Sequence, residues 1–180
     1  MKIWKLQFKL NEYAMLIPTN GIDVDYVQLF DGRSHKSDWK NFEVRRVDDC
    51  LDMPLGDAPG FFLPVLSARA KKALGSILDK DVEFLEVKCD NNIFWCVNVI
   101  NVIDAVDYNK SIYTTFSNSD KILAFKKYCF YEEKLRNCNI FKIPDECKRS
   151  PFVSERFKKT VEEFGLEGFD LQLVWDSEIS

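Results

Sequence analysis

The sequence predicts an α+β fold of mostly antiparallel strands with two main helices. One observation is a strand-to-helix junction at 64–74 that returns at 151–161, at a constant offset of 151 − 64 = 87 positions. Each copy has a proline-led extended segment, a serine at the place of a helix N-cap and then an amphipathic pattern. The other observation is that the remaining chain is rich in strand-like runs without regular strand–helix alternation, which favours the α+β class.

Each junction opens a helix-plus-strand unit. The runs 82–87 and 169–175, which follow the two predicted helices, alternate apolar and polar residues as a half-buried strand does. Gly165 stands where a left-handed residue is expected to end the second helix. Two explanations of the echo between 64–87 and 151–174 remain open: a duplicated unit, or two unrelated junctions that use the same capping chemistry.

The opening third of the chain predicts an antiparallel meander. Short apolar runs mixed with charged residues are bounded there by turn residues. The predicted elements are a strand over 2–10, its hairpin partner over 13–17, a turn over 18–21, and further strands over 25–30 and 42–47.

The middle of the chain holds its most apolar stretch, 93–107. The density of β-branched residues predicts a central strand buried on both faces, interrupted by Asn98 and Asn101. Further predicted elements are strands over 111–116 and 122–130 joined by a polar turn at 117–120, a helical turn over 132–136 and a strand-like segment over 140–144.

The chain predicts a single compact α+β domain over 1–180. The best candidate for a sub-boundary is the loop 51–63, because residues 52–60 hold two glycines and two prolines. Both flanks of this loop are apolar and no long polar linker occurs, so we expect one continuous body with an N-terminal β meander before the loop.

Composition and charge exclude several classes of function. With 46% hydrophobic residues in 180, the chain can bury a packed core. A net charge of −4 argues against a general nucleic-acid binder, and no apolar run reaches the length of a membrane span. The six cysteines form no C-x-x-C pair beside a single histidine, and Gly-rich phosphate-binding motifs are missing, so we expect no metal and no cofactor. Reduced cysteines and an N-terminus without the apolar core of a signal peptide predict a cytoplasmic protein.

Candidate catalytic chemistry is limited to carboxylates. His35 is the only imidazole, and it lies in a polar loop without an assignable nucleophile, so no catalytic residue is assigned. Three acid pairs could bind a divalent metal or divide acid and base roles, or they could cap turns after strands. These pairs are Asp48 with Asp49, Asp104 with Asp107, and Asp176 with Glu178. Asp104 and Asp107 close the most apolar stretch, so we expect them to be held rigidly, which also suits a recognition surface.

Residues for partner contact are predicted from charge and aromatic placement alone. Trp39 and Trp175 are flanked by charges and are either rims of the core or anchors of a contact. The predicted partner-binding residues are Asp104, Asp107, Trp175, Asp176 and Glu178. The Lys-Lys pairs at 71–72 and 158–159 are interpreted as solvated helix faces.

Several stretches together resemble one bacterial family. They are residues 1–6, the junction 64–74 with 82–85, the run 98–107, the segment 140–144, and the ending from 152–157 to 173–176. The family is immunity family eleven of bacterial polymorphic toxin systems, formerly catalogued as a domain family of unknown function. The resemblance implies an inhibitor in the cytoplasm of a toxin-producing bacterium, which binds a cognate toxin domain and blocks its active site or its assembly. It supplies no catalytic residue to place on this sequence.

Two hypotheses of different classes follow. The first is a binding module that neutralises a cognate protein toxin in a stoichiometric complex. The alternative is a carboxylate-dependent hydrolase, with or without a metal, that uses Asp104, Asp107 or the C-terminal acids. Replacing Asp104 and Asp107 with Asn should abolish turnover by a hydrolase, whereas it should only speed the dissociation of an inhibitor from its partner.

Overall fold

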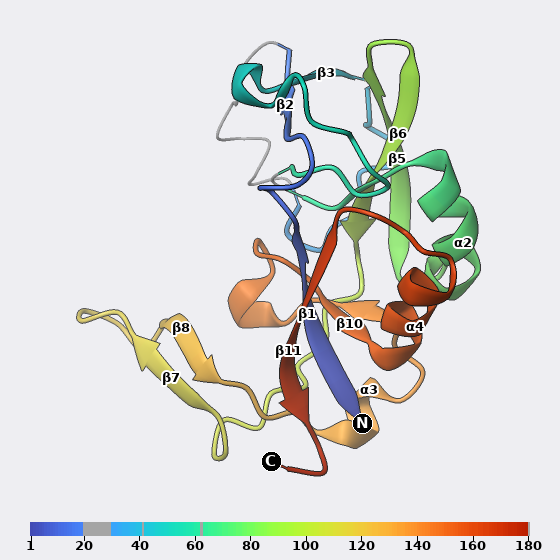
Figure 1. Ribbon diagram of the computed structural model, residues 1–180. Coiled ribbons are helices and arrows are strands. Elements are labelled where there is room, and N and C mark those ends of the chain that lie inside the picture. The colour runs from blue at the N-terminus through green and yellow to red at the C-terminus, as the bar shows by residue number, and fades with distance from the viewer. Residues whose placement is uncertain (20–29, 41, 62, 180) are drawn as a thin grey trace.

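The computed structural model describes residues 1–19, 30–40, 42–61 and 63–179. Within these residues the chain forms two main sheets, a separate hairpin and helices packed beside the sheets (Figure 1). In chain order the elements are β1 Lys2–Phe8, β2 Leu16–Pro18, β3 Phe42–Arg46, η1 Asp48–Cys50, β4 Val65–Leu66, α2 Ala68–Leu78, β5 Val82–Cys89, β6 Asn92–Val99, β7 Ile112–Thr115, β8 Ile122–Lys127, α3 Glu132–Leu135, β9 Ile140–Phe141, η2 Pro144–Glu146, β10 Phe152–Ser154, α4 Glu155–Glu163 and β11 Phe169–Asp176. The predicted α+β class, with strands in the majority, is confirmed.

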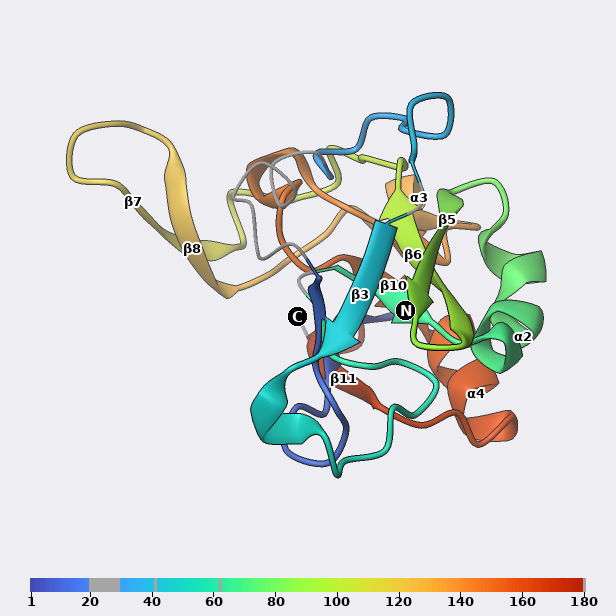
Figure 2. The same cartoon turned by 90° about the horizontal axis from the view of Figure 1, so that it is seen from above.

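The strands pair in three groups. One sheet has the order β11-β1-β10-β9, a second has the order β2-β3-β5-β6-β4, and β7 pairs with β8 alone. The pairings are antiparallel except for β3 with β5, which run parallel. Figures 1 and 2 show α2 and α4 on one side of the molecule and the β7–β8 hairpin projecting from the other.

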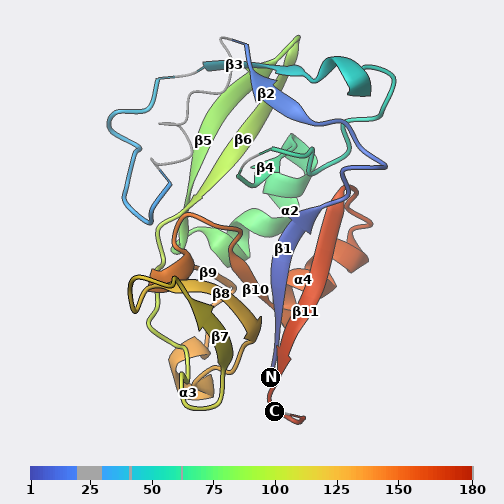
Figure 3. The same ribbon diagram turned by 90° about the vertical axis from the view of Figure 1, so that its left-hand side faces the viewer.

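The two helix-plus-strand units share one arrangement. In the first unit, β4 and β5 lie on either side of β6 and run antiparallel to it, and α2 connects them. In the second, β10 and β11 lie on either side of β1 and run antiparallel to it, and α4 connects them (Figure 3). The central strands differ in origin, because β6 follows β5 along the chain whereas β1 opens the chain.

The offset of 87 positions extends into the pairing of the strands after the helices. Glu86 of β5 pairs with Trp95 of β6, and Leu173, which is 86 + 87, pairs with Trp4 of β1. A register that matches residue by residue is more than a shared capping motif requires, since the register of a strand is set separately from the cap of a helix.

The offset also holds in the segments before the helices. The Val97 N–H donates to the Pro64 carbonyl at 2.7 Å, and the Leu6 N–H donates to the Pro151 carbonyl at 2.9 Å. Each proline therefore enters its unit by the same bond to the central strand. Together with the matched register, this bond favours the duplicated-unit explanation over two unrelated junctions.

Both predicted N-caps are confirmed. Ser67 Oγ accepts from the Ala70 N–H at 3.1 Å, and Ser154 Oγ accepts from the Phe157 N–H at 3.2 Å. Each bond satisfies one of the N–H groups that the first turn of a helix leaves without a partner. Gly165, at φ +54°, takes the left-handed conformation predicted after the second helix.

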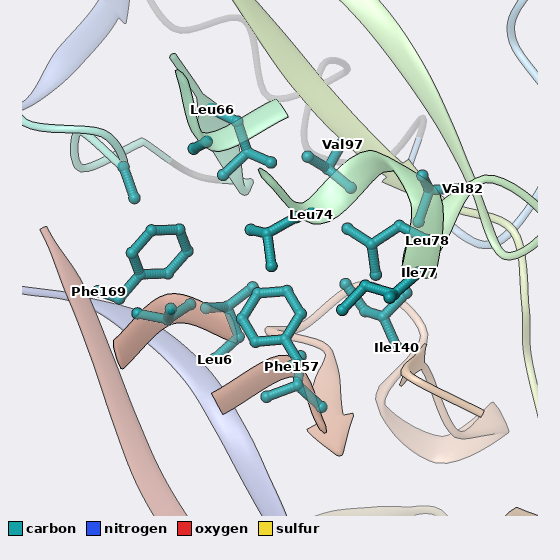
Figure 4. Packing of buried hydrophobic residues seen from close by; sticks show 14 of the residues in the cluster. Leu6, Leu66, Leu74, Ile77, Leu78, Val82, Val97, Ile140, Phe157 and Phe169 are labelled. Carbon is teal, nitrogen blue, oxygen red and sulfur yellow. The ribbon is translucent and has the colours of Figure 1, made fainter. Parts of the chain in front are cut away.

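The two units bury their apolar faces in one shared core. Figure 4 shows Leu74 and Leu78 of α2 gathered with Phe157 of α4, Leu6 of β1 and Phe169 of β11. Because each helix has one apolar stripe, burial of both stripes between the sheets removes them from water together. The helices and both sheets are thus held by the same hydrophobic contacts.

The predicted N-terminal meander is wrong. The β1 strand pairs with β10 and β11 from the far end of the chain, and these two occupy both of its edges. The predicted hairpin partner over 13–17 therefore has no free edge of β1 to join; β2 pairs instead with β3 in the second sheet. The predicted strand over 25–30 lies almost wholly outside the described residues, as does the end of the turn over 18–21.

The predicted central strand over 93–107 is shorter than expected. It forms β6, which ends at Val99, and residues 100–107 make only isolated bridges at Val102 and Val106. The Ile100 N–H still donates to the carbonyl of Asp81, the residue before β5, at 3.0 Å, and farther on the Ile103 N–H donates to the Lys142 carbonyl at 2.8 Å. Within β6, residues 96–99 are buried, as predicted for a central strand.

The predicted boundary loop 51–63 contacts both units. Asp57 is buried, and its carboxylate accepts from the Ser67 hydroxyl at 2.7 Å, from Arg69 at 2.9 Å and from the Glu167 N–H at 3.0 Å. One carboxylate thus joins the start of α2 to the turn before β11. None of the described helices is long and apolar enough to cross a membrane.

Candidate functional site

The acid pair at Asp104 and Asp107 lies at the base of the β7–β8 hairpin. Asp107 is buried, its Oδ1 accepts from the Asn109 N–H at 3.1 Å, and its Oδ2 lies 3.8 Å from Lys110 Nζ. These contacts are those of a turn cap. Asp104 is exposed, and its carbonyl accepts from Lys134 Nζ at 2.6 Å. Only Asp104 of this pair presents a carboxylate to solvent.

The C-terminal candidates are mostly buried as well. Trp175 packs edge-on against Phe130 with ring centroids 5.6 Å apart, so this tryptophan belongs to the core. Asp176 is buried, accepts from the Glu178 N–H at 3.1 Å and lies 3.6 Å from Lys2 Nζ. Glu178 is exposed. Asp104 and Glu178 are therefore the two predicted contact residues whose side chains a partner can reach without rearrangement.

The remaining candidates for chemistry also have structural contacts. The His35 N–H donates to Glu83 at 2.8 Å and its ring packs against Phe30, with centroids 5.8 Å apart. Asp48 is bonded to Arg45 at 2.8 Å. In the part of the chain that the structure describes, no group of three or more His, Cys, Asp and Glu side chains is placed to hold a metal ion.

A buried carboxylate that the sequence did not single out lies next to the hairpin. Glu146 accepts from Lys5 at 2.8 Å, from the Tyr128 hydroxyl at 2.9 Å and from Arg149 at 3.0 Å. Burial and the neighbouring Glu146 charge raise the pKa of Tyr128, so the phenol stays protonated and donates. Glu146 and Arg149 are three residues apart, but Lys5 and Tyr128 come from distant parts of the chain, so no local motif could have revealed the whole network.

The network fixes the hairpin to the body. Arg149, which is bonded to Glu146, also donates to the Leu123 carbonyl in β8 at 2.8 Å. Aromatic contacts also join the hairpin to the body. The ring centroids of Tyr113 and Phe125 are 5.7 Å apart, and Phe125 stacks on Tyr128 with centroids 4.8 Å apart. The hairpin is therefore held to the body by a polar contact at Leu123, near its turn, and by aromatic contacts nearer its base.

Fold and candidate site define an α+β protein whose predicted contact residues are divided between buried structural positions and two exposed carboxylates, Asp104 and Glu178. The model of the immunity protein family Imm11 matches residues 40–176, and the chain belongs to this family. The resemblance noted in the sequence is thus confirmed, and family membership implies a toxin as partner. A search of curated proteins found no match to the chain.

Proposed function

We propose that the chain neutralises a cognate toxin domain in the cytoplasm by forming a stoichiometric complex, and that it acts as an inhibitor without catalytic turnover. The choice between the two hypotheses depends on one observation: candidate carboxylates make structural contacts within the fold. Asp107 caps a turn and Asp176 pairs with Lys2, so each of these two acid pairs has one carboxylate already engaged, which favours a binding module over a hydrolase. Membership of an immunity family supports the same choice.

The two exposed carboxylates, Asp104 and Glu178, are proposed as contacts at the rim of the interface. Charges at a rim act mainly on the rate of association, and truncating them changes affinity little. The variant Asp104→Asn with Glu178→Gln is therefore expected to change the association rate by no more than about 10-fold while leaving dissociation unchanged. The buried Asp107, Trp175 and Asp176 would support this surface from behind.

Rescue by co-expression tests the proposal. The toxin-like product of the neighbouring gene is expressed in a sensitive host with and without this chain, and the rescued pair is purified. We expect survival together with a stable complex of fixed stoichiometry, measured by light scattering after size exclusion. A folded pair that neither rescues nor associates would overturn the proposal.

Titration separates inhibition from catalysis. With toxin activity measured in vitro, an inhibitor protects only when it reaches about one copy per toxin, whereas an enzyme protects at far lower ratios. The variant Asp104→Asn with Asp107→Asn serves as the matched test, because Asn retains the oxygen that caps the turn. Protection at substoichiometric ratios that this double variant abolishes would establish the hydrolase instead.

A further inference from the structure

The hairpin formed by β7, its turn and β8, residues 111–127, is here named the arm. Figures 1 and 2 show it extending away from the body, and its sheet contains two strands alone. Isolated two-stranded hairpins are marginally stable in water, so an arm of this kind depends on its anchored base. The contact of Phe125 with Tyr128 provides that base, and the bond of Arg149 to the Leu123 carbonyl holds the arm nearer its turn.

The arm exposes apolar side chains that the fold does not cover. Ile112 is 55% exposed, Phe116 is 50% exposed and Leu123 is 42% exposed. Exposed apolar groups gathered on one projecting element are typical of a surface that a partner covers. Aromatic and aliphatic anchors of this kind carry most of the energy of protein interfaces.

The arm also differs in charge from the rest of the chain. The arm has a net charge of 3 − 1 = +2, from Lys121, Lys126, Lys127 and Asp120. The rest of the chain therefore has a net charge of −4 − 2 = −6. All three lysines are exposed. A basic arm on an acidic body fits an acidic partner surface, because complementary potentials steer association and like charges on the body discourage the wrong orientation.

We propose that the arm is the main element that docks on the toxin, and that it binds an acidic surface around an apolar depression that receives Phe116 and its neighbours. This inference rests on the proposed function. Nucleic acid fits the arm less well, since three lysines in an acidic protein give little phosphate neutralisation.

The anchored base makes the arm suited to tight binding. A hairpin already held by the Glu146 network loses less conformational freedom when it binds than a loose loop would. Association is expected to depend on the lysines, and dissociation on the apolar side chains.

Two variants of the full chain test these roles against the toxin from the neighbouring gene, made inactive by mutation. Replacing Ile112, Phe116 and Leu123 together with Ser is expected to raise the dissociation rate by at least about 30-fold. Replacing Lys121 and Lys126 with Glu is expected to lower the association rate by at least about 10-fold and to flatten its dependence on salt. Rates are measured by surface plasmon resonance.

The matched control replaces Leu51 and Phe164 with Ser. These side chains are 57% and 55% exposed, as exposed as those of the arm, but they lie elsewhere on the molecule. We expect wild-type rates from this control, and the same circular dichroism and melting temperature as the wild type from every variant.

The outcomes separate the inference from the function on which it rests. If the wild type neutralises and binds the toxin but the arm variants keep its rates within about 2-fold, the arm is not the docking element while the immunity function stands. If the wild type itself fails to bind the toxin, both the docking role of the arm and the proposed immunity function are overturned. Wild-type toxin binding by the arm variants, together with the loss of oligonucleotide binding or of self-association, would assign the arm to another partner and overturn the inference.

Discussion

Lys71 and Lys158 lie 158 − 71 = 87 positions apart, and each holds its ammonium over the ring of a tryptophan in the central strand of its unit. The Lys71 ammonium is 4.2 Å from the centre of the Trp95 ring, and the Lys158 ammonium is 6.0 Å from that of Trp4. The interpretation of both Lys-Lys pairs as solvated faces therefore holds for the second lysine of each pair and fails for the first.

Removing the closer of these contacts should destabilise the fold measurably. We expect Lys71→Ala to lower the free energy of unfolding by about 0.5–1 kcal/mol, because a cation over a tryptophan face is favourable and Lys71 is half-buried. Urea unfolding measures this, with the exposed neighbour variant Lys72→Ala as control. Lys158→Ala should cost less, given its longer distance. Equal effects of Lys71→Ala and Lys72→Ala would show that the ring contact contributes nothing.

Two glycines should respond in opposite directions to the same substitution. Gly168 has φ +89°, and a Cβ there would lie 2.5 Å from the Ala58 carbonyl oxygen, so Gly168→Ala should destabilise by about 1–3 kcal/mol. Gly75 lies within α2 and a Cβ there would meet only Asp79, at 3.9 Å, so Gly75→Ala should stabilise by about 0.5–1 kcal/mol. Thermal unfolding of both variants measures the signs, and the same sign in both would contradict this account.

Local chemistry in the sequence predicted the elements but not their partners. The caps at Ser67 and Ser154, and the turn at Gly165, follow from the residues that make them. Pairing of β1 with β11 joins residues from opposite ends of the chain, and no period or turn residue near Lys2 indicates that partner. The meander was predicted because neighbouring strands usually pair, and the shared core of the two units overrides that tendency.

At the candidate site, too, the sequence predicted local features but not the contacts between distant residues. Asp104 and Asp107 were predicted to close a long central strand, but that strand ends at Val99, and which of the two is buried depends on contacts such as Asp107 with Asn109 that form only in the fold. The arm was predicted as two strands joined by a turn. That it projects from the body depends on the absence of a third strand beside it among the described residues, which its own sequence does not encode.

The contribution of Lys142 to stability should rise with pH through the range in which Lys142 titrates. Lys142 is buried and donates to the Phe30 carbonyl at 2.6 Å, and burial lowers its pKa to about 8, an effect that nearby Cys147 and Asp31 only partly oppose. An unfolded lysine has a pKa of about 10.4. Between these values the unfolded state binds more protons than the folded state, so the free energy of unfolding increases as pH rises.

Comparison with Lys142→Met isolates this effect from the other titrating groups. Burial raises the pKa of Cys89 and Cys96, so these thiols lower stability as pH rises, but they do so equally in both proteins. From about pH 7.5 to about pH 9.5 the wild type should gain about 1–2 kcal/mol relative to Lys142→Met in urea unfolding. The exposed Lys72→Met should track the wild type across this range. A constant difference between the wild type and Lys142→Met would mean that Lys142 keeps an ordinary pKa in the fold.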